Sequence, residues 1–153
     1  MIKKLPYKTC VALAAILCML LFQQCTKEAG SVNISFRNKS LQLVQSYVSG
    51  KWRLNYAYGG IAATRYPAKH HAYLNLTDSH ITIGNDSAGV IVDTVANWRK
   101  EPDGPNNSIT LVSYFFAPGY SFAYNYVVDE IKNDTLILHD YTSDAIYYYY
   151  TRW

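Results

Sequence analysis

Histidine and cysteine are the residues of this 153-residue chain that could support metal or nucleophilic chemistry. The four histidines are His70, His71, His80 and His139. Converging histidines can hold a zinc ion. None of these spacings places two histidines on one face with a third ligand, because neighbouring residues in a strand point to opposite faces. We therefore expect no metal site and no cofactor.

The amino terminus has the pattern of an export signal. Three lysines precede an apolar run over residues 11–22. This run is far shorter than the roughly 20 residues that a membrane-spanning helix needs. A basic start followed by a short apolar run is typical of a secretory signal peptide, so we expect residues 1–24 to be removed.

The apolar run leads into Gln23, Gln24 and Cys25. This ending resembles the lipobox of bacterial lipoproteins, in which the cysteine that closes the apolar run is acylated and becomes the first mature residue. The resemblance implies that Cys25 anchors the protein in a membrane. The two glutamines stand where small residues are usual, and cleavage nearby with a free Cys25 thiol is the alternative. Thr26, rather than aspartate, follows the cysteine, which favours the outer membrane by resemblance to sorting signals of some Gram-negative bacteria.

Removal of the signal changes both the cysteine count and the net charge. Cys10 and Cys18 leave with it and Cys25 carries lipid, so no disulfide can form within one mature chain. Three of the 14 lysines and arginines also leave, and the remaining 11 are balanced by 11 acidic residues. Without a basic surplus we expect no nucleic-acid partner. With no glycine-rich phosphate loop, nucleophile elbow or Cys-His pair, we predict that the protein is not an enzyme.

The 129 residues that remain are enough for one domain with its own core. We expect residues 25–40 to form the lipidated cysteine and a polar tether, and residues 41–153 to form the domain. At the start of this domain, Leu41, Val44 and Val48 recur at helical spacing, which predicts one or two helical turns.

From Trp52 onward the apolar residues alternate with a period of two, as in half-buried strands. Turn-forming residues separate eight such runs, and short turns of this kind join antiparallel neighbours. The runs cover residues 52–58, 72–77, 81–83, 90–95, 109–116, 122–128, 136–141 and 146–152. We predict an all-β fold, an eight-stranded antiparallel up-and-down β-barrel with a short N-terminal helix, because closure removes exposed sheet edges.

Motifs at both ends of this meander resemble the lipocalins. Gly50 and Trp52 form a Gly-x-Trp motif at the first strand, and Arg152 stands near the end of the last. In that superfamily the tryptophan plugs the closed end of the barrel and the arginine packs across its indole. With Cys25 and the Gly-Gly pair at residues 59–60, the chain is similar to lipocalin-like lipoproteins of Gram-negative bacteria over roughly residues 47–153. The middle-chain lipocalin motifs are not evident, so an open sheet or a differently closed barrel is the alternative.

Tyrosines line the predicted interior. If Trp52 faces inward, strand parity turns the later tyrosines of its strand inward too, and an Arg152 packed on Trp52 places two tyrosines of the last strand on the same side. A third tyrosine row has no fixed orientation. The candidate ligand-binding residues are Tyr56, Tyr58, Tyr124, Tyr126, Tyr148 and Tyr150. Phenol rings combine an apolar body with a polar hydroxyl, which suits a small apolar or aromatic ligand.

The sequence thus predicts a lipid-anchored, non-enzymatic protein of the outer membrane whose barrel binds a small hydrophobic ligand. The alternative is a structural or protein-interaction module of the envelope with a barrel filled by its own side chains. In that case the outward rings of the last strand, Tyr147 and Tyr149, together with Trp153, would form an exposed aromatic surface.

Overall fold

The computed structural model describes residues 30–116 and 123–153. The predicted signal peptide (residues 1–24) and the predicted lipidation site Cys25 lie outside the described residues. The chain divides between Ser31 and Val32, and the fold below is that of the unit that begins at Val32. This unit begins before the predicted domain boundary at residue 41, because the segment assigned to the tether includes a strand and the fully buried Phe36.

The described residues form an antiparallel β-structure with one short helix, α2 (Leu41–Val48). The strands are β1 (Ile34–Ser35), β2 (Gly50–Gly59), β3 (Thr64–Pro67), β4 (Tyr73–Leu76), β5 (His80–Asn85), β6 (Gly89–Val95), β7 (Asn97–Pro102), β8 (Ser108–Phe115), β9 (Ala123–Lys132), β10 (Thr135–Asp140) and β11 (Ile146–Arg152). The all-β fold and the short helix are confirmed. The predicted count of eight strands is wrong, since the described residues contain eleven.

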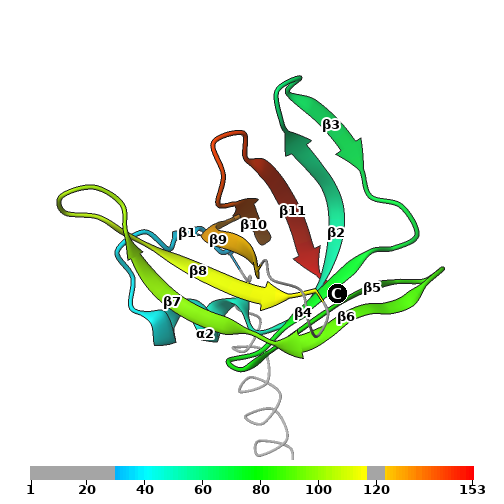
Figure 1. Ribbon diagram of the computed structural model, residues 1–153, viewed down its shortest axis with the longest axis horizontal. Helices are drawn as coiled ribbons and strands as arrows, with labels where there is room; N and C mark the ends of the chain where they lie inside the picture. Colours follow the sequence, from blue (N-terminus) through cyan, green and yellow to red (C-terminus); the bar gives the residue numbers. More distant parts are fainter. Residues whose placement is uncertain (1–29, 117–122) are drawn as a thin grey trace, which may run out of the picture. The chain divides into compact units, whose positions relative to one another are not determined.

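The three additional strands arise where a neighbouring strand is short or interrupted. β3 and β4 pair one after the other with the same edge of β2. β6 and β7 are separated only by Ala96, and Figure 1 shows them as successive parts of one bent ribbon. β1 is a two-residue strand that pairs with β9. Hydrophobic alternation alone does not reveal where a strand is interrupted, because the apolar residues alternate with a period of two on both sides of the interruption.

The main sheet has the strand order β6-β5-β4-β2-β11-β10-β9-β8-β7, with every neighbouring pair antiparallel. The first and last long strands, β2 and β11, pair from Trp52–Arg152 to Gly59–Ile146. The two ends of the order, β6 and β7, are consecutive in the chain and meet at Ala96. The sheet is therefore nearly closed into a barrel (Figure 1), with the break between β6 and β7.

Helix α2 packs at one end of this barrel, which we call the closed end. The Ser40 side chain caps the helix by accepting a hydrogen bond from the Leu43 N–H (3.3 Å). Val44 and Val48 are fully buried and belong to the same core cluster as Trp52. An eight-residue helix is marginal by itself, so this burial is what holds it in place.

A register shift in the pairing of β2 with β11 reverses the facing of part of β2. Tyr150 is opposite Leu54, but Tyr149 is opposite Tyr56, so Asn55 is an extra residue on β2. One extra residue turns every later side chain to the other face. Ala57 is consequently buried and Tyr58 is 42% exposed. The predicted inward orientation is therefore wrong for Tyr56 and Tyr58.

Candidate functional site

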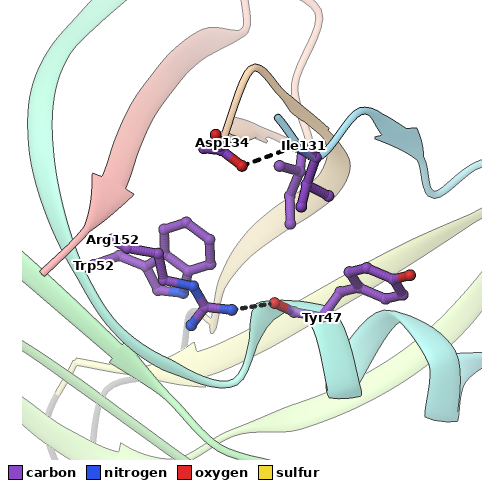
Figure 2. A pocket seen from close by; sticks show the side chains of 6 residues that line it. Tyr47, Trp52, Ile131, Asp134 and Arg152 are labelled. Carbon is purple, nitrogen blue, oxygen red and sulfur yellow. Dashed lines mark hydrogen bonds between the residues drawn. The ribbon is translucent and has the colours of Figure 1, made fainter. Parts of the chain in front are cut away.

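At the closed end, Arg152 of β11 packs on Trp52 of β2, as the resemblance to the lipocalins implied (Figure 2). The Arg152 guanidinium lies 3.9 Å from the centre of the Trp52 ring. It also donates hydrogen bonds of 2.6 Å to the carbonyl oxygens of Tyr47 and Ser49. The Trp52 indole N–H donates to the Val48 carbonyl at 2.7 Å. Arginine near a helix C-terminus satisfies carbonyls that lack partners in the helix.

Gly50 makes this arrangement possible. Its backbone φ is +117°, and a Cβ there would stand 2.8 Å from Arg152 Nη1. The glycine of the Gly-x-Trp motif therefore serves both backbone geometry and the close approach of the arginine. The cavity beside Trp52 and Arg152 measures only about 70 Å³. This is well below the roughly 300 Å³ at which small-molecule sites begin, so the role of this end is structural.

A larger cavity of about 270 Å³ lies farther along β9, β10 and β11. We call it the mouth pocket; it is lined by Ala123, Tyr124, Asn125, Tyr126, Asp140, Tyr141, Thr142 and Tyr148. On β11, Tyr148 precedes Arg152 by four residues, which corresponds to about 13 Å along the strand. The mouth pocket is thus at the end of these strands away from Trp52.

Three of the predicted tyrosines meet in the mouth pocket: Tyr124, Tyr126 and Tyr148. The rings of Tyr126 and Tyr148 are in edge-to-face contact with centroids 5.3 Å apart, a favourable aromatic geometry. Tyr150 lies on the same face but is buried in the core. Tyr56 and Tyr58 do not reach the pocket, because the extra residue Asn55 turns them to the outer face.

Tyr114 belongs to the same cluster, although sequence reasoning did not select it. Its ring stacks on Tyr124 at 5.5 Å and lies 5.9 Å from Tyr126. The hydroxyl oxygens of Tyr114 and Tyr126 are 3.5 Å apart. Tyr114 is the cross-strand partner of Tyr124, so the signal that identifies it is the register of β8 against β9, which hydrophobic periodicity does not provide.

Asp140 contributes a carboxyl group to the pocket, and it too was not a predicted site residue. The Tyr148 hydroxyl donates to Asp140 Oδ2 at 3.4 Å, and the Ile146 backbone N–H also bonds to this carboxyl. Burial raises the pKa of Asp140 despite both hydrogen bonds. Burial also raises the pKa of Tyr126 and of Tyr148, so both phenols stay neutral at physiological pH.

The outer face of the barrel carries a second group of aromatic rings. Tyr149 stacks on Tyr56 with centroids 4.4 Å apart, and the Arg65 guanidinium covers Tyr56 at 4.0 Å. Tyr147 instead packs on the His139 ring at 4.8 Å. Trp153, which the sequence grouped with the tyrosines, packs edge-on against Tyr73 and beneath the Lys51 ammonium. The expected aromatic surface is therefore divided among several local contacts.

Two of the histidines are paired with carboxylates. His71 Nδ1 is 2.5 Å from an oxygen of Asp86, and His80 Nε2 is 2.6 Å from an oxygen of Asp93. In residues 30–116 and 123–153, no three potential metal ligands cluster. Over the same residues, no helix has the length and apolarity to span a membrane.

No known family model matches this chain, and no curated protein or solved structure matches it either. The geometry of the mouth pocket is therefore the basis for a functional assignment.

Proposed function

We propose that this chain is a lipid-anchored protein of the bacterial outer membrane with a lipocalin-like barrel that binds one small apolar or aromatic ligand in the mouth pocket. The observation that carries the ligand proposal is the convergence of Tyr124, Tyr126 and Tyr148 around a cavity of about 270 Å³. Binding sites for small molecules combine apolar walls with a few polar groups that fix orientation. The three rings supply the walls, and Asp140 supplies a polar group.

The size of the pocket limits the ligand. Cavities for drug-sized molecules run from about 300 to 1,000 Å³, so the mouth pocket suits a molecule with about one ring. The rest of the interior is occupied by side chains, because Trp52, Leu74 and Leu138 are at most 1% exposed. A large lipid would not fit along the barrel axis.

The folded unit begins at the closed end. The Val32 N–H donates to Asp134 Oδ1 at 2.8 Å, and the Asp134 N–H returns a bond to the Val32 carbonyl. Asp134 lies in the turn between β9 and β10 and lines the small cavity beside Trp52. This position of Val32 supports the proposed ligand-binding function, because the chain that follows Cys25 enters the fold at the end away from the mouth pocket.

The lipid anchor is tested with Cys25→Ser. We expect this variant to leave the membrane fraction while keeping the thermal unfolding curve of the parent domain. Each buried methylene contributes about 0.8 kcal/mol, and two or more acyl chains anchor a protein stably. Cys10→Ser is the matched control, because it makes the same change at a cysteine of the predicted signal. A Cys25→Ser protein that still sediments with membranes would contradict the anchor.

The ligand is tested by native mass spectrometry of the full-length protein, purified gently from its own envelope. We expect an adduct of one small molecule that is weakened by Tyr124→Ala. Tyr66→Ala is the matched control, because Tyr66 is 49% exposed and Tyr124 is 51% exposed, but only Tyr124 lines the mouth pocket. A protein without any adduct that also fails to take up small aromatic compounds would contradict the proposal.

A structural or protein-interaction module is the second candidate. The observation that favours it is the group of outer-face rings around Tyr56, Tyr149 and the exposed Tyr58. This candidate predicts that Tyr58→Ser abolishes a specific cross-link to an envelope component, whereas Tyr124→Ala does not.

A further inference from the structure

The mouth pocket contains one carboxyl group and no basic group among the described residues. Of the described residues that line it, Asp140 alone has a carboxyl or basic side chain; the other polar groups are phenols, an amide and a hydroxyl. The pocket therefore has negative charge and no described cation to balance it.

Other carboxylates of the barrel have partners that Asp140 lacks. Asp103 pairs with Arg37 at 2.8 Å, and Glu101 pairs with Arg99 at 2.7 Å. Asp93 faces His80. Over residues 30–116 and 123–153, Asp140 forms no ion pair. Its bonded partners are a tyrosine hydroxyl and a backbone N–H, both neutral donors.

Burial of this carboxyl group is unfavourable for its charged form. Desolvation is the largest influence on Asp140, and it raises the pKa of this group. A positive charge bound beside Asp140 would offset the desolvation and lower that pKa. Asp140 is thus a partly buried carboxyl group with neutral bonded partners, and the adjacent His139 is the one basic group that lowers its pKa among the causes that act on it in the described residues.

The aromatic walls have the same preference. Tyrosine faces attract an ammonium group within about 6 Å of the ring centre, and rings arranged around a cavity recognise organic ammonium ions. Tyr126 and Tyr148 both line the pocket and are in edge-to-face contact, with ring centroids 5.3 Å apart and ring planes at 75°. Tyr124 forms a further wall, held by its stack on Tyr114.

We infer that the mouth pocket selects a small organic cation, an amine or quaternary ammonium compound, whose charge lies between Asp140 and the tyrosine rings. This inference rests on the proposed ligand-binding function and specifies its ligand class. Among single-ring compounds the pocket prefers the cationic one, because an anion meets Asp140 and a neutral compound leaves its charge unbalanced.

The test uses three probes with the same ring and different charge: phenethylammonium, 2-phenylethanol and 3-phenylpropanoate. Their affinities for the full chain are measured by isothermal titration calorimetry at pH 7.5. We expect the cation to bind at least about tenfold more tightly than the alcohol, and the anion to bind most weakly. The pKa of Asp140 is also measured, by NMR titration of a protein with ¹³C-labelled carboxyl groups. We expect this pKa to be lower with phenethylammonium bound than in the free protein.

Asp140→Asn removes the charge and keeps an acceptor oxygen for the Tyr148 hydroxyl. We expect this variant to bind phenethylammonium at least about tenfold more weakly than the parent protein does. Its affinity for 2-phenylethanol should change by less than about twofold. Asp144→Asn is the matched control, because this exposed residue carries the same charge in the following turn and does not line the pocket. The control should leave all three affinities unchanged.

The outcomes separate the cation preference from ligand binding itself. If the alcohol binds as tightly as the cation, or if Asp140→Asn leaves the cation unaffected, the preference is overturned while a ligand pocket remains. If none of the probes binds but native mass spectrometry shows an apolar adduct that Tyr124→Ala removes, the cation preference alone is again overturned. If no probe binds and no adduct appears, both the preference and the proposed function fail.

Discussion

Arg152 and Trp52 are direct cross-strand partners, and the arginine covers the indole ring at 3.9 Å. The same guanidinium bonds to the carbonyls of Tyr47 and Ser49 at the end of α2. The last strand, the first long strand and the helix are therefore joined at one side chain. This explains why a single arginine near the carboxyl terminus can fix how the barrel closes.

Replacing these two residues should show that their contributions are coupled. Trp52→Ala removes a ring that is 1% exposed and should cost about 3–5 kcal/mol of unfolding free energy. Arg152→Ala should cost less, about 1–2 kcal/mol, because its guanidinium is partly solvated. Urea unfolding of the double variant should show less than the sum of the single losses, because both singles remove one contact. Arg53→Ala, at an exposed neighbour, should change stability by less than about 0.5 kcal/mol.

Gly50→Ala should destabilise the same end by a different route. The alanine would have to adopt a φ of +117° and would place its Cβ 2.8 Å from Arg152 Nη1. Such backbone strain costs about 1–3 kcal/mol. Thermal unfolding of Gly50→Ala with and without Arg152→Ala separates the two causes, because removal of the arginine relieves the steric contact only. An alanine variant as stable as the parent would show that the glycine is not required.

The sequence was informative about this end because its residues have unusual types. Tryptophan, arginine and glycine at Trp52, Arg152 and Gly50 formed a recognisable motif, and their predicted contact is present. The helix was equally predictable, since Val44 and Val48 lie one turn apart and are both buried.

The mouth pocket was only partly predictable, because it depends on strand register. Tyr126 and Tyr148 were expected, but Tyr114 and Asp140 join them through pairing of β8 with β9 and of β9 with β10. The predicted facing of Tyr56 was wrong because a tyrosine can lie on either face of a strand. The small Ala57 beside it gave no sign that the inner and outer faces of β2 exchange after Asn55. A period-two pattern fixes the facing of a strand only as long as no residue is extra.

Deletion of Asn55 tests that reversal directly. Without Asn55, Leu54 and Tyr56 become consecutive residues, and consecutive strand residues point to opposite faces, as these two already do. We therefore expect the rest of β2 to keep its facing and the loss of stability to be about 1–2 kcal/mol, measured by circular dichroism and thermal unfolding. Deletion of Arg53, which is regularly paired with Thr151, should instead cost at least about 3 kcal/mol or prevent folding, because it turns one half of β2 to the wrong face. Asn55→Ala should cost less than about 1 kcal/mol, since it loses only the 3.3 Å bond from the Thr151 hydroxyl. Deletion of Ser87, in the exposed β5–β6 turn, is the control for shortening the chain.

The stability of the protein should depend on pH through Asp140. Its pKa in the folded state is raised above the ordinary value of 3.8, so the folded state holds this proton more tightly than the unfolded state. Stability must therefore fall as the pH rises from 3.8 through the folded pKa, and the loss persists at neutral pH. Among the groups that face Asp140, Tyr114, Tyr126 and Tyr148 do not titrate in this range, because burial raises the pKa of each.

Asp140→Asn removes the ionisable group. The change in unfolding free energy that this substitution causes should therefore be more favourable at pH 7 than at pH 3. The comparison between the two pH values cancels any constant cost of losing one acceptor oxygen. Urea unfolding at both pH values gives this difference, with Asp144→Asn as the exposed control. Repeating the pair of measurements in a His139→Gln background excludes the adjacent histidine as the source. A variant whose relative stability does not change with pH would show that burial of Asp140 has no energetic cost, and the carboxyl group would then have no need of a cation.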